Sequence, residues 1–170
     1  MATFKRSAST AERSYFRVEV YAQPMTQQQP YTVLRKIDGF ELRRYPSYVL
    51  VQAAIESDFD RSGNLGFRPL FRYITGDNAA SSKIAMTAPV IQQERGKLDN
   101  IVSFVLPQRM DVASVPVPRD ETVSIKQVPA HDAAGLTSVG SVYYARFDPP
   151  WMPGFARHNE ALIAVESPAY

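Results

Sequence analysis

The fold is decided by Gly66-Phe-Arg-Pro-Leu-Phe-Arg-Tyr-Ile-Thr-Gly76 and by Lys83-Ile-Ala-Met-Thr-Ala-Pro-Val90, which follows shortly after it. In the first stretch, apolar side chains recur at positions i, i+3, i+4 and i+7, so the pattern predicts a short amphipathic helix. Gly76 can adopt the left-handed conformation that ends a helix, and we expect the helix to stop there. The second stretch is an apolar run that carries Met86 and predicts a strand.

The predicted helix has an aromatic side and a basic side. Its apolar stripe contains Phe67 and Phe71, and the other side carries Arg68 and Arg72. An aromatic surface edged by guanidinium groups suits a flat, apolar, anionic ligand. The same spacing is typical of an ordinary helix that packs on a core, so the pattern alone leaves both interpretations open.

Strands dominate the chain on either side of this helix. Two alternating runs, residues 31–37 and 40–45, flank Asp38-Gly39, a dipeptide that favours a two-residue hairpin turn. Residues 58–65 read as a loop or a ragged first turn of the helix. If the regular helix starts near Gly66, Pro69 lies in its first turn, where proline is tolerated; otherwise we expect the helix to kink there. One helix among many strands indicates the α+β class, with mainly antiparallel sheet. The other predicted strands are residues 48–55, 84–92, 100–106, 122–128, 139–147 and 160–165.

The composition is that of a globular protein. The chain has 170 residues, 45% of them apolar, which suits one domain with a sizeable core. Its net charge of +2 is too small to indicate a nucleic-acid partner, and no apolar run approaches membrane-spanning length. We therefore expect a soluble, cytoplasmic protein. We expect residues 1–24 to form an N-terminal extension, with disorder as one alternative, and residues 25–170 to form the single domain. Met25 is an alternative start of the protein.

The sequence carries no signal for catalysis. It has no cysteine, which excludes disulfides, thiolate nucleophiles and cysteine-ligated metal sites. It also lacks the glycine-rich phosphate loops, the Gly-x-Ser-x-Gly elbow and the His-Glu-x-x-His zinc motif, and no His, Asp and Glu residues have metal-ligand spacing. We therefore predict a protein that is not an enzyme and that has no metal site built from its own side chains.

Several motifs resemble the SOUL family of haem-binding proteins, in its bacterial-type form. They are Phe40-Glu-Leu-Arg-Arg-Tyr45, the two stretches quoted first, and Tyr144-Ala-Arg-Phe-Asp-Pro-Pro-Trp151 followed by Arg157-His-Asn-Glu160. The resemblance implies a distorted antiparallel β-barrel or sheet with helices packed on it. It also implies a haem or other tetrapyrrole ligand, bound reversibly and without catalysis by a carrier, buffer or sensor.

The chain departs from the family pattern in one place. The family's second half should carry a further strand and a second helix before Leu136, where this chain has only Ala130-His-Asp-Ala-Ala-Gly135. Loss of a helix uncovers apolar sheet surface, whose burial is worth roughly 25 cal/mol per Å². We expect a homodimer, a domain swap or the N-terminal arm at residues 15–21 to cover that surface. The remaining alternative is a gene product that folds poorly.

The resemblance places the ligand in a hydrophobic cleft beside the predicted helix. There, Arg68 and Arg72 would pair with the haem propionates, while Phe67 and Phe71 would contact the ring. The family has no dependable shared histidine ligand. Met86 could supply a soft axial ligand, although a methionine in an apolar strand more often fills space.

The remaining candidates for the site lie later in the chain. Trp151, between prolines, would be either a lid on a pocket or the anchor of a loop. His158 would be either an axial ligand or a surface histidine. His131 is expected in solvent, with iron ligation as the less favoured alternative.

Two other functions are open from the sequence. One is an effector-binding module of the gyrase-inhibitor-like type, which would hold an organic cation through a buried carboxylate such as Glu41 or Glu56. The other is a protein-interaction adaptor that uses the uncovered face of the sheet.

Overall fold

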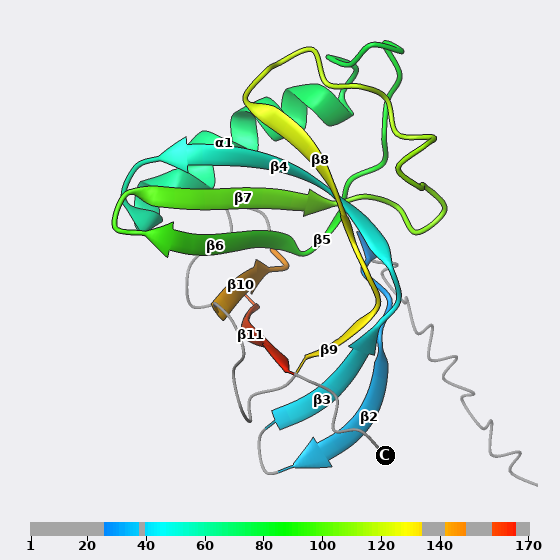
Figure 1. The fold of residues 1–170 in the computed structure, drawn as a ribbon, viewed down its shortest axis with the longest axis vertical. Helices are drawn as coiled ribbons and strands as arrows, with labels where there is room; N and C mark the ends of the chain where they lie inside the picture. Colours follow the sequence, from blue (N-terminus) through cyan, green and yellow to red (C-terminus); the bar gives the residue numbers. More distant parts are fainter. Residues whose placement is uncertain (1–25, 38–39, 134–141, 149–157, 166–170) are drawn as a thin grey trace, which may run out of the picture.

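The fold is seen in a computed structural model that describes residues 26–37, 40–133, 142–148 and 158–165 (Figure 1). Within these residues lie the helix α1 and the strands β1 to β11. The elements are β1 Gln27–Gln28, β2 Thr32–Ile37, β3 Phe40–Tyr45, β4 Tyr48–Glu56, α1 Phe59–Ile74, β5 Thr87–Ala88, β6 Val90–Gly96, β7 Asp99–Val105, β8 Val123–Val128, β9 His131–Ala133, β10 Val142–Arg146 and β11 Asn159–Val165.

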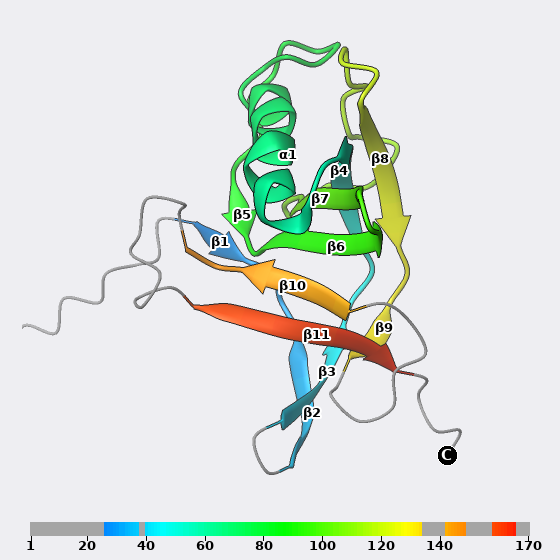
Figure 2. The same cartoon turned by 90° about the vertical axis from the view of Figure 1, so that its left-hand side faces the viewer.

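Nine strands form one antiparallel sheet in the order β2-β3-β9-β11-β10-β6-β7-β4-β8, and β1 pairs separately with β5. The helix α1 packs on β4 and β7 in one part of this sheet, while β10 and β11 run below it (Figure 2). The sheet is strongly bent and is not closed into a barrel. The chain therefore has the predicted α+β fold in its open, distorted-sheet form.

The sheet bends along two long segments, each made of two consecutive strands, which we call ribbons. The first is β3 continuing into β4 across Pro46-Ser47, and the second is β8 continuing into β9 across Pro129-Ala130. The ribbons pair on both sides of this interruption, with Tyr45 opposite His131 and Tyr48 opposite Val128. Because proline cannot donate a ladder hydrogen bond, both ribbons break at the same level and the sheet changes direction there.

The helix begins earlier than the sequence predicts. Asp58 caps it, since the Asp58 carboxylate accepts a hydrogen bond from the Arg61 backbone N–H at 2.9 Å. Of the two predicted alternatives for residues 58–65, the loop is wrong, because the helix already includes Phe59, and Pro69 lies inside the helix rather than in its first turn. Gly66 lies inside the helix because a Cβ there would lie 2.6 Å from Val102 Cβ, so the helix can approach the sheet this closely only with glycine at this position.

The main core lies between α1 and the sheet. Leu70, Tyr73 and Ile74 of the helix are buried against inward side chains of β4, β7 and β8. On the sheet side this cluster includes Val49, Val51, Ala53, Val102, Phe104 and Val123. Alternate residues of the same strands point to the opposite face, where a smaller cluster forms around Leu50, Ile91 and Val105.

Most of the predicted strands are confirmed, with two differences. Residues 84–86 lie outside the strands, and a short strand, β9, lies in residues 130–135, where the family's further strand was expected to be missing. The hairpin of β2 and β3 is present, whereas its turn at Asp38-Gly39 lies outside the described residues. The predicted extension over residues 1–24 also lies outside them. Among the helices described, none is long and apolar enough to cross a membrane.

Candidate functional site

A cavity of about 190 Å³ lies on the face of the bent sheet that points away from α1. Along β4, Tyr48, Leu50 and Gln52 line this cavity, while the residues between them pack in the core beneath the helix. The cavity reaches across the bend, because β3 and β9 contribute Tyr45 and His131. We call it the sheet pocket, and its walls come from both parts of the sheet.

The walls of the sheet pocket are largely aromatic and aliphatic. The rings are Tyr45, Tyr48, Tyr143 and His131. The aliphatic side chains are Leu50, Ile91, Val128 and Leu162, and the polar ones include Gln29, Gln52, Gln93, Ser103 and Lys126. An apolar wall with a few polar groups is typical of a small-molecule binding site.

Burial keeps two of the pocket's phenols neutral. Removal from water raises the pKa of Tyr48 to about 12. A hydrogen bond from Gln29 lowers this pKa, but by less than burial raises it. Burial also raises the pKa of Tyr45, against the opposing influence of the Arg43 guanidinium. These tyrosines therefore offer ring faces and hydroxyl groups at neutral pH, and not phenolate oxygens.

The described wall of the sheet pocket carries a lysine and no acidic side chain. None of the described residues that line it is aspartate or glutamate, whereas Lys126, which is exposed, lies on its wall. The polar pair Gln52 and Ser103 is satisfied internally, because the Gln52 amide donates to the Ser103 hydroxyl at 3.0 Å. An anionic group on a bound molecule would therefore find a cation at this site and no described acidic neighbour.

Ion pairs connect the strands β3, β9 and β11 beside the sheet pocket. The Arg44 guanidinium of β3 donates to both carboxylate oxygens of Asp132 of β9, at 2.8 and 2.9 Å. Arg43 reaches Glu160 of β11 with an Nη2–Oε1 distance of 3.1 Å. These contacts join β3, β9 and β11, the strands that form the far side of the bend.

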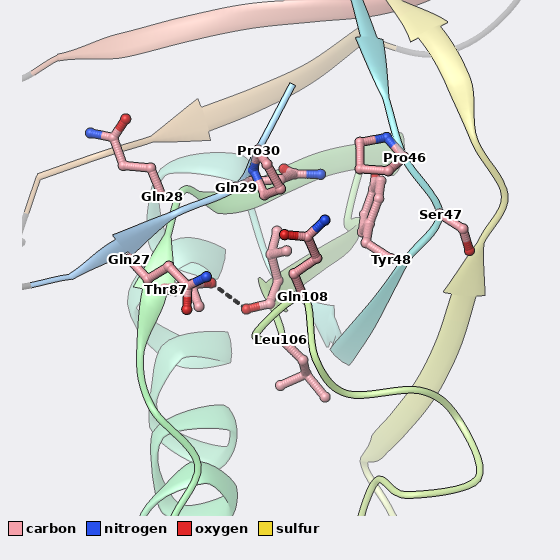
Figure 3. A pocket seen from close by; sticks show the side chains of 11 residues that line it. Gln27, Gln28, Gln29, Pro30, Pro46, Ser47, Tyr48, Thr87, Leu106 and Gln108 are labelled. Atoms are coloured by element: carbon pink, nitrogen blue, oxygen red, sulfur yellow. Dashed lines mark hydrogen bonds between the residues drawn. The ribbon is translucent and has the colours of Figure 1, made fainter. Parts of the chain in front are cut away.

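A second hollow is too small for an organic ligand. It lies beside β1 and the beginning of β4 and has a volume of about 10 Å³, roughly the room that one water needs (Figure 3). The Thr87 hydroxyl donates to the Val105 carbonyl beside it, and its wall includes Gln29 and Tyr48, which also line the sheet pocket.

The residues predicted to form a cleft beside the helix lie on the other side of the sheet from the sheet pocket. Phe67 packs in the core against Phe104, with ring centroids 5.1 Å apart, and also stacks on Phe71, whose side chain is 46% exposed. Arg68 and Arg72 are exposed, and Arg72 donates to Asp120 at 2.8 Å. These side chains form an aromatic and basic surface, and none of them lines either hollow described above.

The other predicted site residues are spread over the fold. Met86 is half-buried against the core beneath α1. His158 stacks on Phe147 at 4.6 Å, and its Nε2 lies 3.2 Å from a Glu160 carboxylate oxygen. Trp151 lies outside the described residues. The structure thus brings Phe67, Arg68, Phe71 and Arg72 together and leaves Met86 and His158 away from them.

Sequence reasoning missed the sheet pocket. Its residues come from strands that are distant along the chain and meet only because the ribbons bend. One signal was available: residues 48–55 form a nearly continuous apolar run, and such a strand must bury both of its faces. One face meets α1, and the other lines the pocket.

Comparisons with known proteins bear on both family and fold. The family model described as SOUL heme-binding protein matches residues 26–140. A solved structure titled "Crystal structure of EcmrR C-terminal domain" has a TM-score of 0.53 and 13% identity, with 80% of this chain and 98% of that chain covered. A chain of "Cryo-EM structure of EcmrR-DNA complex in EcmrR-RPo" has a TM-score of 0.52 and 14% identity, with 75% and 57% covered. These likenesses concern the fold alone, and no curated protein matches the chain.

Proposed function

The chain belongs to the SOUL heme-binding protein family, whose model matches residues 26–140, and from this premise we propose that it binds haem or a porphyrin in the sheet pocket. In this proposal binding is reversible and not catalytic, as in a carrier, buffer or sensor in the cytoplasm. The observation that carries it is the cavity of about 190 Å³ walled by aromatic and aliphatic side chains from both sides of the bend. Flat aromatic ligands gain most from such walls, through both burial and ring contacts.

The residues present fit a tetrapyrrole in chemistry. The macrocycle needs apolar and aromatic walls, which the tyrosines of the lining help to supply. Its carboxylates need a cation, such as Lys126, and its iron can bind an imidazole, such as that of His131. The cavity is smaller than the ~300–1,000 Å³ of sites that enclose a drug-sized ligand. Part of a macrocycle would therefore stay outside, which suits a ligand whose propionates remain in water.

The charges of the sheet pocket argue against an organic cation as the ligand. Glu41 is paired with Lys36 at 3.0 Å and with Arg43 at 2.9 Å, and it does not line the cavity. Glu56 is exposed at the end of β4, away from the lining residues. An effector module for cations needs a carboxylate inside its site, and neither candidate supplies one there.

The surface of α1 is the second candidate location for the same ligand. The stacked pair Phe67 and Phe71, with Phe71 46% exposed, offers an aromatic face beside Arg68 and Arg72. A planar ring could lie on it, with its carboxylates on the guanidinium groups. We favour the sheet pocket, because a ligand on an open surface buries less of its area than one held between walls.

Two matched charge reversals separate these locations. Lys126→Glu alters the sheet pocket and Arg68→Glu alters the helix surface, and both positions are exposed, so neither change should disturb folding. In a visible-absorbance titration with hemin, we expect a saturable Soret shift at one equivalent. Because an exposed ion pair is worth about 0.2–1 kcal/mol and reversal replaces attraction by repulsion, Lys126→Glu should weaken binding about three- to tenfold. Arg68→Glu should change it less than about twofold.

Other outcomes of these experiments would support the alternatives. If Arg68→Glu weakens hemin binding and Lys126→Glu does not, the ligand lies on the helix surface. Absence of any Soret shift in the unaltered protein, together with thermal stabilisation by organic cations, would favour the effector-module alternative. Concentration-dependent sedimentation tests the homodimer or domain swap, which predicts almost no stable monomer.

A further inference from the structure

We propose that His131 is the axial ligand to the iron when haem occupies the sheet pocket, an inference that rests on the proposed function. His131 is the first residue of β9 and lies directly opposite Tyr45 of β3 in the sheet register. Its ring stacks on Tyr45 at 5.5 Å and meets Tyr48 at 5.8 Å, and the residue lines the cavity. The imidazole is thus a part of the pocket wall that neighbouring rings hold in place.

The backbone fixes which nitrogen of His131 is free to bind a metal. Nδ1 lies 3.1 Å from the carbonyl oxygen of Pro129. A carbonyl oxygen can only accept a hydrogen bond, so this contact requires the hydrogen on Nδ1. In the neutral imidazole the lone pair is then on Nε2, for which no described residue is a hydrogen-bond partner. A histidine that donates from one nitrogen to a backbone carbonyl and keeps a lone pair on the other is the usual metal-ligating arrangement.

Two other candidate ligands among the described residues, His158 and Met86, are less well placed. The sequence has two histidines, and the second, His158, is exposed and lies 3.2 Å from a Glu160 oxygen, away from the lining residues. Met86 packs on the opposite side of the sheet, against the core beneath α1.

The test compares hemin with iron-free protoporphyrin IX, which fills the same space and needs no axial ligand. Unaltered protein should bind both, and the hemin complex should show the absorption and resonance Raman features of imidazole-ligated haem. His131→Gln should weaken hemin binding about tenfold or more, because even groups that only orient a ligand are worth about 10–100-fold in metal affinity. The same change should alter protoporphyrin IX binding less than about threefold, with circular dichroism showing that the variant is folded.

Chemical rescue and a second variant complete the test. Free imidazole added to hemin-loaded His131→Gly should restore the spectrum of the unaltered complex. His158→Gln should leave that spectrum unchanged. If His131→Gln keeps both the spectrum and the affinity, or if His158→Gln removes them, the assignment of His131 is overturned while haem binding stands. If the unaltered protein binds neither hemin nor protoporphyrin IX, the proposed function fails, and the ligand assignment fails with it.

Discussion

The rings of Tyr45 and His131 stack across the β3–β9 ladder, with centroids 5.5 Å apart and planes inclined by only 19°. The pair lies just beyond the point where Pro46 and Pro129 interrupt the two long ribbons. Cross-strand aromatic pairs stabilise a sheet by roughly 0.2–1 kcal/mol each. The stack therefore supports the bend that brings the two walls of the sheet pocket together, so fold and candidate site depend on the same contact.

Alkaline pH should destabilise the protein through Tyr48. Its pKa is raised from 10.0 to about 12 in the folded state, so the unfolded chain releases this proton first. The stabilising contribution is complete below pH 10 and is lost as the pH rises towards about 12. We expect Tyr48→Phe to reduce the fall in the free energy of unfolding over this interval, as measured by urea denaturation.

The effect should be reduced and not abolished, because a second tyrosine behaves in the same way. Burial raises the pKa of Tyr73 to about 12, and its hydroxyl donates to the Pro116 carbonyl at 2.6 Å. An unchanged pH dependence in Tyr48→Phe would mean that Tyr48 ionises as easily in the folded protein as in the unfolded chain.

Gly66 should not tolerate alanine. The added Cβ would meet Val102 Cβ and Cγ2 at 2.6 Å, and because Val102 Cβ is attached to the backbone, helix and sheet must move apart. Overpacking of this kind costs roughly 1–3 kcal/mol, more than the ~1 kcal/mol gained when glycine leaves a helix interior. We expect Gly66→Ala to lower the free energy of unfolding by about 1–2 kcal/mol.

The matched control for Gly66 is Asn64→Ala, an exposed position in the same helix. It should be neutral or stabilising by a few tenths of a kcal/mol, since alanine is the better helix former. If thermal denaturation shows the same change for both variants, the close approach of α1 and β7 does not govern the choice of glycine.

Asn78 should be essential for the chain after the helix. It is fully buried, and its amide donates to the carbonyls of Tyr73 at 2.9 Å and Ser82 at 2.8 Å. Its own carbonyl accepts from the Ser82 N–H at 3.2 Å. Alanine would remove these three hydrogen bonds; the Tyr73 carbonyl keeps one from the Gly76 N–H at 3.3 Å, whereas the half-buried Ser82 carbonyl and N–H lose their Asn78 partners. Each loss of a partner in a buried site costs about 1–3 kcal/mol. We expect Asn78→Ala to destabilise the protein by about 2–4 kcal/mol in urea denaturation.

Asp77→Ala is the comparison for Asn78, because Asp77 is adjacent and only half-buried. A change within about 0.5 kcal/mol is expected there. Equal losses in the two variants would show that the turn tolerates neither substitution for reasons other than the hydrogen bonds of Asn78.

The sequence predicted the parts of the fold that local pattern controls. Alternation and the Asp38-Gly39 turn signal identified the β2–β3 hairpin. Helical spacing identified Leu70 and Ile74 on the buried face of α1, but Phe71 of the same predicted stripe is 46% exposed.

The start of α1 was missed because Ser62, Gly63 and Asn64 are weak helix formers. Gly63 lies in the helix where it packs closely against Gln92 and Arg146 of other strands. A tertiary contact of this kind leaves no periodic signal in the helix itself.

The sheet pocket could not be predicted for a related reason. Tyr45 and His131 are distant along the chain, and they meet because β3 pairs with β9. The strand β9 at His131 was not predicted, because it is set by pairing with Arg43, Arg44 and Tyr45 on one side and with β11 on the other. The residues predicted for the helix surface are real neighbours, since Phe67 stacks on Phe71, and their role in binding stays a prediction.

The most direct test of the central claim, that the sheet pocket holds a tetrapyrrole, is methyl NMR during titration with protoporphyrin IX. The ring current of a porphyrin shifts only those methyl groups that lie close to it. We expect large shifts for methyls of Leu50 and Ile91, which line the pocket, and none for Leu65, which is 41% exposed on α1, or for Met86 beneath it. Shifts confined to Leu65 and Met86 would contradict the account and place the ligand beside the helix.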